Sequence, residues 1–291
     1  MGVPMLFPPE ATPVWSPKGG TKVSETEETI KRYSTGMLRE RVHTALRAEG
    51  HEPEVLKASD LGEADHFHIG GREATQFVAL KLHIGLGTRV LDVGSGLGGP
   101  ARYFASQGAV VTGVDITSEF VDLANELDNA CGMGGSITML RHPAQHTGLA
   151  AESFDTAVLM HVGMNLGEKR AVFTEIFRVL RRGGSLGIYD LMGSNELTYP
   201  LPWADSADTS HVESGEAYID HLIGAGFDVS QNIDRRHEAL ALATRMQAGR
   251  PGPLDIPIVL GDRPELRMKH VFEAIAADLI TPRLIVAVKP D

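Results

Sequence analysis

The residues with the most definite chemical potential are three glycines and two acids in the middle of the chain. Gly94, Gly96 and Gly98 follow an apolar stretch that contains Asp92, and Asp115 closes the next apolar stretch. Glycines directly after a strand let the backbone turn sharply and approach a ligand closely. An acid that ends the next strand, about twenty residues on, accepts hydrogen bonds from a ribose diol. The pattern predicts a site for a nucleotide-like cofactor.

Two cofactors fit this spacing. Gly94, Gly96 and Gly99 satisfy the G-x-G-x-x-G pattern of dinucleotide sites, whereas Asp92 with Gly94, Gly96 and Gly98 satisfies D-x-G-x-G-x-G. The carboxylate of Asp92 beside the loop repels a pyrophosphate and attracts a cationic group. We therefore predict S-adenosylmethionine (AdoMet), which carries an amino group, with a nicotinamide dinucleotide as the alternative.

Alternating strands and helices must position this loop. Apolar runs predict strands, and apolar residues at helical spacing predict helices. The predicted strands are 90–93, 110–114, 137–140, 156–160, 186–189 and 284–288. The predicted helices are 24–48, 73–81, 118–130, one with Phe173, Ile176, Phe177 and Leu180 on one face, and 217–223. This alternation indicates an α/β fold, a parallel sheet with helices on both faces.

The remaining segments suggest four regions. Five prolines in 1–20 predict a Pro-rich arm over 1–23. Ser24 and Glu27 form a capping box, which opens the helix that we expect to run toward Ala48. Segments 193–213 and 237–280 fall outside the alternation and are predicted to cover the carboxyl edge of the sheet, where open α/β sheets bind ligands. The regions are the arm 1–23, an N-terminal helical cap 24–71, an AdoMet-binding core 72–193, and the rest of the core with its cover segments 194–291.

Composition narrows the class of protein. The chain has 291 residues, and its 27 Lys and Arg against 38 Asp and Glu give a net charge of −11. Such acidity disfavours nucleic acid and anionic membrane surfaces as partners. The single cysteine, Cys131, suits a reducing compartment, and neither a secretory signal nor a membrane span is visible, so we expect a cytoplasmic protein. The sequence leaves the possibility of a homo-oligomer open.

Motifs at several points resemble one family, the class I AdoMet-dependent methyltransferases. The loop 92–98 is similar to their cofactor loop, and 179–186 is similar to the turn before their fifth strand. Four further matches resemble the sarcosine/dimethylglycine N-methyltransferase-like group, namely 65–71, 160–165, 188–190 and 200–204. The resemblance covers roughly residues 65–229. It implies a Rossmann-like, seven-stranded, mostly parallel sheet and methyl transfer to a small polar metabolite, first of all the amine nitrogen of a sarcosine- or dimethylglycine-like acceptor.

The resemblance also implies roles for individual residues. Asp92, Gly94, Gly96 and Gly98 would hold the methionine end of AdoMet. Asp115 would bind the ribose, Ile116 would pack on adenine, and Phe67 and His68 would close over the cofactor. His161 would lie beside the cofactor, and Asn165 would face the acceptor. Relatives carry an acid where this chain has Pro143, so we expect Ala144 or Gln145 to recognise adenine, through the backbone or the Gln145 side chain.

Several readings remain open at this point. Trp203 is either an aromatic wall that shields the acceptor site or a packing anchor, and His161 either accepts a proton from the acceptor or is a core residue. His66 and His68 resemble a metal-binding pair, but no third ligand is evident, so we expect no metal. For the function, O-, S- or C-methylation, a nicotinamide oxidoreductase and a non-catalytic AdoMet binder stand as alternatives.

Overall fold

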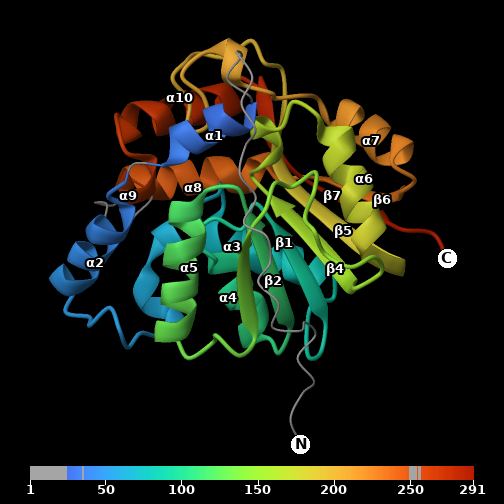
Figure 1. Ribbon diagram of the computed structural model, residues 1–291. Coiled ribbons are helices and arrows are strands. Elements are labelled where there is room, and N and C mark those ends of the chain that lie inside the picture. Colours follow the sequence, from blue (N-terminus) through green and yellow to red (C-terminus); the bar gives the residue numbers. More distant parts are fainter. Residues whose placement is uncertain (1–24, 35, 249–253, 255–256) are drawn as a thin grey trace, which may run out of the picture.

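Seven strands form one sheet among the residues that the structure, a computed structural model, describes: 25–34, 36–248, 254 and 257–291 (Figure 1). Their order is β3-β2-β1-β4-β5-β7-β6. The strands are β1 Arg89–Val93, β2 Val110–Asp115, β3 Ile137–Arg141, β4 Phe154–Met160, β5 Leu180–Gly193, β6 Asp228–Asp234 and β7 Ile280–Val288. The arm over 1–23 and the capping role of Ser24 lie outside the described residues.

The strands β3, β2, β1, β4 and β5 run parallel, whereas β7 pairs antiparallel with β5 and with β6. The mostly parallel, Rossmann-like sheet predicted from the sequence is therefore confirmed. The carboxyl ends of β1, β2 and β4 meet at one edge, and this arrangement brings Asp92, Asp115 and the residues after Met160 together. The strand β6, an edge strand in which exposed and half-buried residues alternate, is not among the strands predicted from the sequence.

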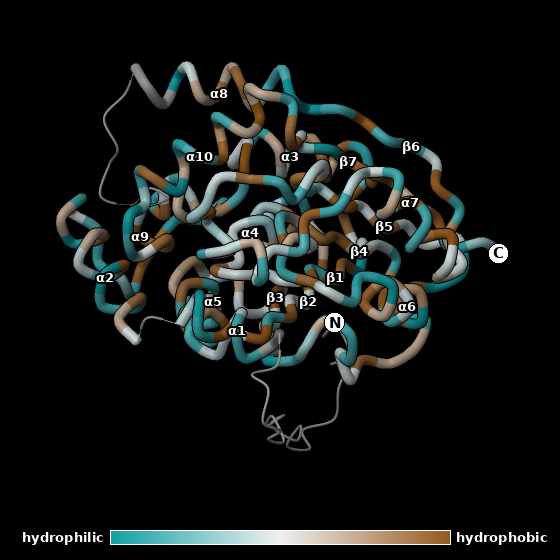
Figure 2. The backbone as a smooth tube through the Cα atoms, turned by 90° about the horizontal axis from the view of Figure 1, so that it is seen from above, coloured by the Kyte–Doolittle hydropathy of each residue, from teal (hydrophilic) through white to brown (hydrophobic). Residues whose placement is uncertain are grey.

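Helices cover both faces of the sheet (Figures 1 and 2). One apolar cluster joins α3 Gly71–Lys81, α4 Gly99–Ser106 and α5 Ser118–Ala130 to one face. A second cluster joins α6 Lys169–Val179 and α7 Gly215–Gly224 to the other. One prediction was wrong in detail: Leu180 is the first residue of β5 and not part of the helix, because the chain turns extended there, with φ −72° and ψ 138°.

The N-terminal segment forms two helices, α1 Glu25–Tyr33 and α2 Leu38–Ala48, so the single helix predicted as far as Ala48 was wrong. Between them Gly36 adopts a positive φ of 70°, which suits glycine and ends a right-handed helix. The carboxylate of Glu119 on α5 accepts hydrogen bonds from the backbone N–H groups of Gly36, at 3.0 Å, and Leu38, at 2.6 Å. This tertiary contact stabilises the break between α1 and α2. As a result, α1 lies over the carboxyl edge of the sheet.

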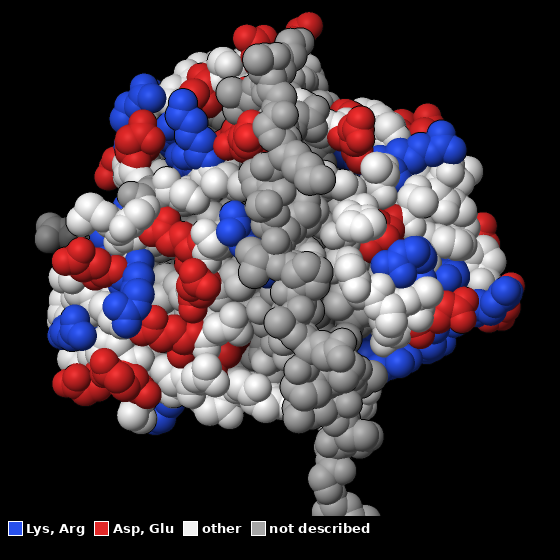
Figure 3. Space-filling model, viewed as in Figure 1, with Lys and Arg blue, Asp and Glu red and all other residues white. Residues whose placement is uncertain are grey.

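The segments after β5 and β6 build the cover that the sequence predicted. The segment after β5 contains a short 3-10 turn at Ala207–Thr209, and the segment after β6 contains α8 Arg236–Ala248, α9 Pro257–Leu260 and α10 Pro264–Ala276. Further 3-10 turns lie at Ala58–Leu61, Glu63–Asp65 and Gly163–Asn165. Apolar side chains of α8 and α10 pack with Ile69, Leu191 and Trp203 in one cluster. No helix in the described part of the chain is long and apolar enough to cross a membrane. On the face shown in Figure 3, acidic and basic side chains are interspersed.

Candidate active site

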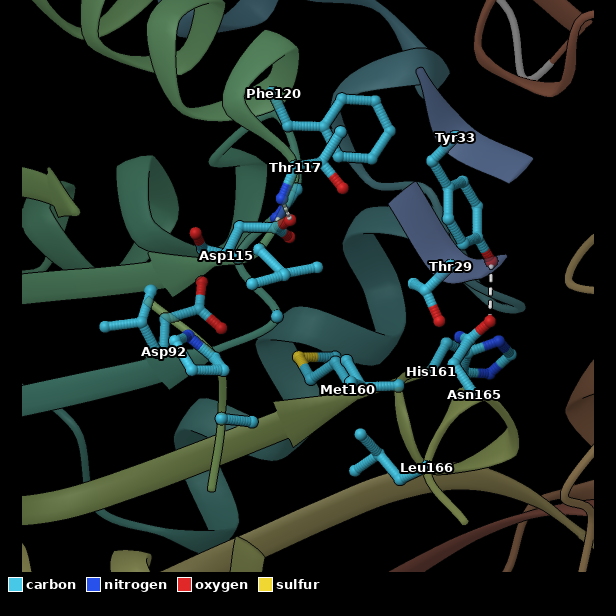
Figure 4. Close-up of a pocket in the computed structure, with 18 of the residues that line it drawn as sticks. Thr29, Tyr33, Asp92, Asp115, Thr117, Phe120, Met160, His161, Asn165 and Leu166 are labelled. Carbon is cyan, nitrogen blue, oxygen red and sulfur yellow. Dashed lines mark hydrogen bonds between the residues drawn. The ribbon is translucent and has the colours of Figure 1, made fainter. Parts of the chain in front are cut away.

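A cavity of about 180 Å³ lies at the carboxyl ends of β1, β2 and β4, with α1 on its far side (Figure 4). Asp92 and Asp115 lie toward one end and Tyr33, His161 and Asn165 toward the other. The predicted site residues that line it are Phe67, His68, Asp92, Gly94, Gly96, Asp115, Ile116, Ala144, Gln145, His161 and Asn165. The lining residues that the sequence did not single out include Thr29, Tyr33, Phe120 and Glu168.

The carboxylate of Asp92 is buried without full pairing. Its exposed fraction is 2%, and its Oδ2 atom has no hydrogen-bond partner among the described residues. Burial, with a smaller contribution from Asp115, raises the pKa of Asp92 to about 7. An unpaired buried anion is costly, and a cationic ligand relieves that cost. The amino group of AdoMet fits this position.

Asp115 ends β2 and is held by the backbone around it. Its Oδ2 accepts from the N–H of Gly96 at 3.0 Å, and its Oδ1 accepts from the N–H of Thr117 at 2.8 Å. Each carboxylate oxygen can accept a second hydrogen bond, and Asp115 lines the cavity. Burial raises its pKa, which these backbone donors counteract. The remaining acceptor positions fit a ribose diol.

Two glycines of the loop, Gly96 and Gly98, lie in different surroundings. At Gly96, with φ 52°, a Cβ atom would meet nothing within 4 Å, so the backbone faces open space at the cavity. At Gly98, with φ 88°, a Cβ atom would lie 2.7 Å from Cε of Met139. Gly98 is the N-cap of α4 and is not among the lining residues, so its role in binding the cofactor stays a prediction. The positive φ of 88°, a conformation that L side chains rarely adopt, accounts for glycine at this position.

The segment after β3 forms the end of the cavity that the family resemblance gives to adenine. His142, Pro143, Ala144 and Gln145 all line it, and the Gln145 side chain is exposed at its rim. The carbonyl of Asp115 accepts from the N–H of His142 at 3.1 Å, which ties this segment to β2. The segment supplies backbone and amide groups in place of the missing acid.

His161 follows β4 in a strained conformation. Its φ is 56°, a region that costs a non-glycine residue about 1–3 kcal/mol, and its N–H donates to the carbonyl of Tyr189 at 2.8 Å. Its ring stacks on that of Tyr189, with centroids 5.6 Å apart. The Nε2 atom is buried without a hydrogen-bond partner among the described residues, and burial lowers the pKa of His161 well below 6.5. The imidazole is therefore neutral at physiological pH.

His66 and His68 are turned toward one hydroxyl group. Oγ1 of Thr75 lies 3.0 Å from Nδ1 of His66 and 3.1 Å from Nε2 of His68. Burial lowers the pKa of His66 to about 4 and that of His68 to about 3, so both rings are neutral. The ring of His68 lies 5.9 Å from that of His161. No group of three potential metal ligands is present in the part of the chain that the structure describes.

Helix α1 closes the cavity through Tyr33. Its hydroxyl donates to Oδ1 of Asn165 at 3.3 Å, a contact between residues 132 positions apart (Figure 4). The ring of Tyr33 also lies 5.9 Å from that of Phe120 on α5. No motif around Tyr33 marks it as a site residue in the sequence. Its place over the cavity depends instead on the break after α1, which a tertiary contact holds.

Trp203 lines a second, smaller cavity of about 40 Å³. Its exposed fraction is 4%, and its Nε1 donates to Oγ of Ser210 at 2.9 Å. The indole is thus anchored in the cover and forms a wall at the same time. Trp203 does not line the main cavity, although Tyr33, Phe67, His68 and His161 line both.

Comparisons with known proteins agree with this geometry. Residues 91–188 match the family described as a methyltransferase domain. A sterol 24-C-methyltransferase of Yarrowia lipolytica is 29% identical over 178 residues, which cover 56% of this chain and 46% of that protein. The chain spans about half the length of the curated relatives it matches, with 46% and 50% of two of them.

Solved structures share the fold at lower identity. Phosphoethanolamine N-methyltransferase 2 of Haemonchus contortus, in complex with phosphomonomethylethanolamine and S-adenosylhomocysteine, has a TM-score of 0.67 and 20% identity, over 93% of this chain and 61% of that one. A putative sarcosine dimethylglycine methyltransferase from Galdieria sulphuraria has a TM-score of 0.59 and 18% identity, over 75% and 86% of the two chains. Residues 91–188 therefore match a methyltransferase domain, and the chain shares its Rossmann-like fold with these methyltransferases of known structure.

Proposed function

We propose that the whole chain is an enzyme that transfers a methyl group from AdoMet to a small molecule. The observation that carries this proposal is the unpaired Oδ2 of Asp92, buried in a cavity beside the open loop at Gly96 and the half-satisfied carboxylate of Asp115. When bound, AdoMet supplies an electrophilic methyl group on a sulfonium sulfur.

Different residues of the chain bind different parts of the cofactor. Asp92 pairs with the amino group, Asp115 accepts from the ribose hydroxyls, and Ile116 packs against adenine. Ala144 and Gln145 offer adenine the backbone and amide groups that replace the acid missing at Pro143. Phe67 and His68 close over the cofactor from the N-terminal side, where both line the cavity.

We propose an amine nitrogen as the reacting atom of the acceptor. An amine attacks through its lone pair and must therefore arrive unprotonated. The neutral imidazole of His161, whose Nε2 has no partner among the described residues, accepts a hydrogen bond from the N–H of such an amine and so directs its lone pair toward the methyl group. Asn165 orients the acceptor, and Tyr33 holds Asn165 in place. Catalysis then rests chiefly on positioning and on exclusion of water.

A carbon nucleophile is the second candidate. The relative from Yarrowia lipolytica is named a sterol 24-C-methyltransferase, and the second cavity beside His161 is mainly apolar. Carbon methylation leaves a proton to be removed after the methyl group has moved, and His161 is placed to accept it. An acceptor panel separates the two candidates.

The test is release of S-adenosylhomocysteine, measured with AdoMet and a panel of amines, alkenes, phenols and thiols. We expect turnover with an amine, and turnover that depends on His161. Turnover with alkenes alone would replace the amine by carbon. Tight AdoMet binding without product from any acceptor would instead support a non-catalytic binder.

A further inference from the structure

The second cavity opens beside the place where a methyl acceptor must arrive. It shares Tyr33, Phe67, His68 and His161 with the main cavity, so the two spaces meet at these side chains. At this junction Nε2 of His161 and Nδ1 of His68 are buried without hydrogen-bond partners among the described residues. A molecule in the second cavity would therefore place a polar atom at the junction and its remaining atoms beyond it.

The walls beyond the junction are apolar. They are formed by Ile69, Met164, Leu191, Trp203, Met268 and Val271. The second cavity has a volume of about 40 Å³, which holds roughly three water-sized groups and is enough for a short chain of carbon atoms. No Asp, Glu, Lys or Arg of the described residues lines it.

The charged residues around the two cavities disfavour the binding of an anionic acceptor. In the described part of the chain, no Lys or Arg lines the main cavity either, whereas Asp92, Asp115 and Glu168 do. Two arginines lie nearby, and both are turned to other groups. Arg267, next to Met268 on α10, donates to the carbonyl of Leu201 at 2.6 Å and pairs with the carboxylates of Asp205 and Asp262. Arg32, whose guanidinium lies 5.8 Å from the Tyr33 ring, donates to the carbonyl of Leu260 at 3.3 Å and 3.4 Å. A carboxylate or phosphate placed here would be buried without a lining cation among the residues that the structure describes, which is unfavourable.

We propose that the second cavity binds the body of the methyl acceptor, and that the acceptor is an amine with a short apolar body and no carboxylate or phosphate. This inference rests on the proposed methyl transfer and narrows its substrate class. It replaces the sarcosine-like acceptor that the sequence resemblance implied, because no Lys or Arg of the described residues lines either cavity to pair with the carboxylate of sarcosine.

A matched pair of acceptors tests the proposal. N-methylpropylamine and sarcosine carry the same secondary amine, and differ in an ethyl group against a carboxylate. With saturating AdoMet, we expect the kcat/KM of N-methylpropylamine to exceed that of sarcosine by about tenfold or more. Equal values, or a preference for sarcosine, would overturn the proposal.

A substitution in the cavity wall gives a second readout. Met268→Lys places a cation at the half-buried edge of the second cavity. It should reduce the ratio of kcat/KM for N-methylpropylamine to kcat/KM for sarcosine by about tenfold. Leu80→Lys, the same kind of change at an exposed site on α3, is the control and should leave the preference unaltered. An unchanged preference in Met268→Lys would place the acceptor elsewhere.

Equilibrium binding keeps the proposal testable if no amine is methylated. Butan-1-ol and butyrate are a neutral and an anionic probe of similar length, and their binding to the complex with S-adenosylhomocysteine can be measured by ligand-observed NMR. We expect butan-1-ol to bind more tightly than butyrate, and Met268→Lys to reduce this difference. Tighter binding of butyrate, or binding of neither probe, would overturn the assignment of the cavity, whereas failed turnover with intact probe binding would count only against the amine.

Discussion

Replacing Asp92 by Asn should stabilise the cofactor-free protein and weaken its binding of AdoMet. In the folded protein, burial raises the pKa of Asp92 from 3.8 to about 7. The native state therefore binds this proton more tightly than the unfolded chain, and ionised Asp92 costs stability as the pH rises from about 4 to 7. At about 1.4 kcal/mol per pH unit, the upper bound on this cost at pH 7 is about 4 kcal/mol.

Chemical denaturation of Asp92→Asn at several pH values measures this cost. We expect the variant to be more stable than the wild type at pH 8, and the difference to vanish below about pH 4, where Asp92 is protonated in both states. Asp155→Asn is a matched control, because Arg89 and Arg181 donate to Asp155 and lower its pKa, so the same change should destabilise the protein. A variant at position 92 that is no more stable than the wild type at any pH would refute the argument.

Cofactor binding should respond in the opposite direction. Asp92→Asn removes the anion that pairs with the amino group, and we expect AdoMet affinity to fall by about 30-fold or more, since a buried charge pair is worth about 2 kcal/mol or more. In the wild type, affinity should rise as the pH passes about 7 and Asp92 ionises. Calorimetric titration at pH 6 and pH 7.5 checks both expectations, and equal affinity in the variant and the wild type would remove Asp92 from the site.

Four further substitutions separate the roles of the site residues. Asp115→Ala should weaken AdoMet binding by about 100-fold or more, through loss of two charge-assisted hydrogen bonds, as calorimetry would show. Gln145→Ala should weaken binding only if its side chain, rather than the backbone, contacts adenine; unchanged affinity would leave the backbone alone. Gly98→Ala should cost about 1–3 kcal/mol of unfolding free energy, measured by denaturation, while AdoMet affinity stays within a few-fold of the wild type. His161→Ala should lower turnover and change AdoMet affinity modestly; normal turnover would make the histidine structural.

The sheet was predictable because its central strands carry local signals. Val90 to Val93 is a short apolar run that ends in glycines, and Val110 to Asp115 is another that ends in an acid. Both strands are buried on both faces, so their sequences read as continuous apolar stretches. The strand β6 gave no such signal, because an edge strand with one exposed face tolerates the polar residues of Asp228–Asp234.

The parts of the site that were missed depend on contacts between distant residues. The break after α1 is fixed by Glu119, which lies 83 positions beyond Gly36, and the position of Tyr33 over the cavity follows from that break. The second cavity is likewise assembled from segments that start at Tyr33 and end at Val271. Local sequence patterns predict elements and loops, whereas the walls of an acceptor cavity follow only from their packing.

We propose that AdoMet occupies the main cavity, held by Asp92 and Asp115. Calorimetric titration of the wild-type protein at pH 7.5 with AdoMet, and separately with NAD⁺, tests this proposal. We expect AdoMet to bind at one site per chain and NAD⁺ to show no measurable binding. Binding of NAD⁺ with no binding of AdoMet would contradict this proposal.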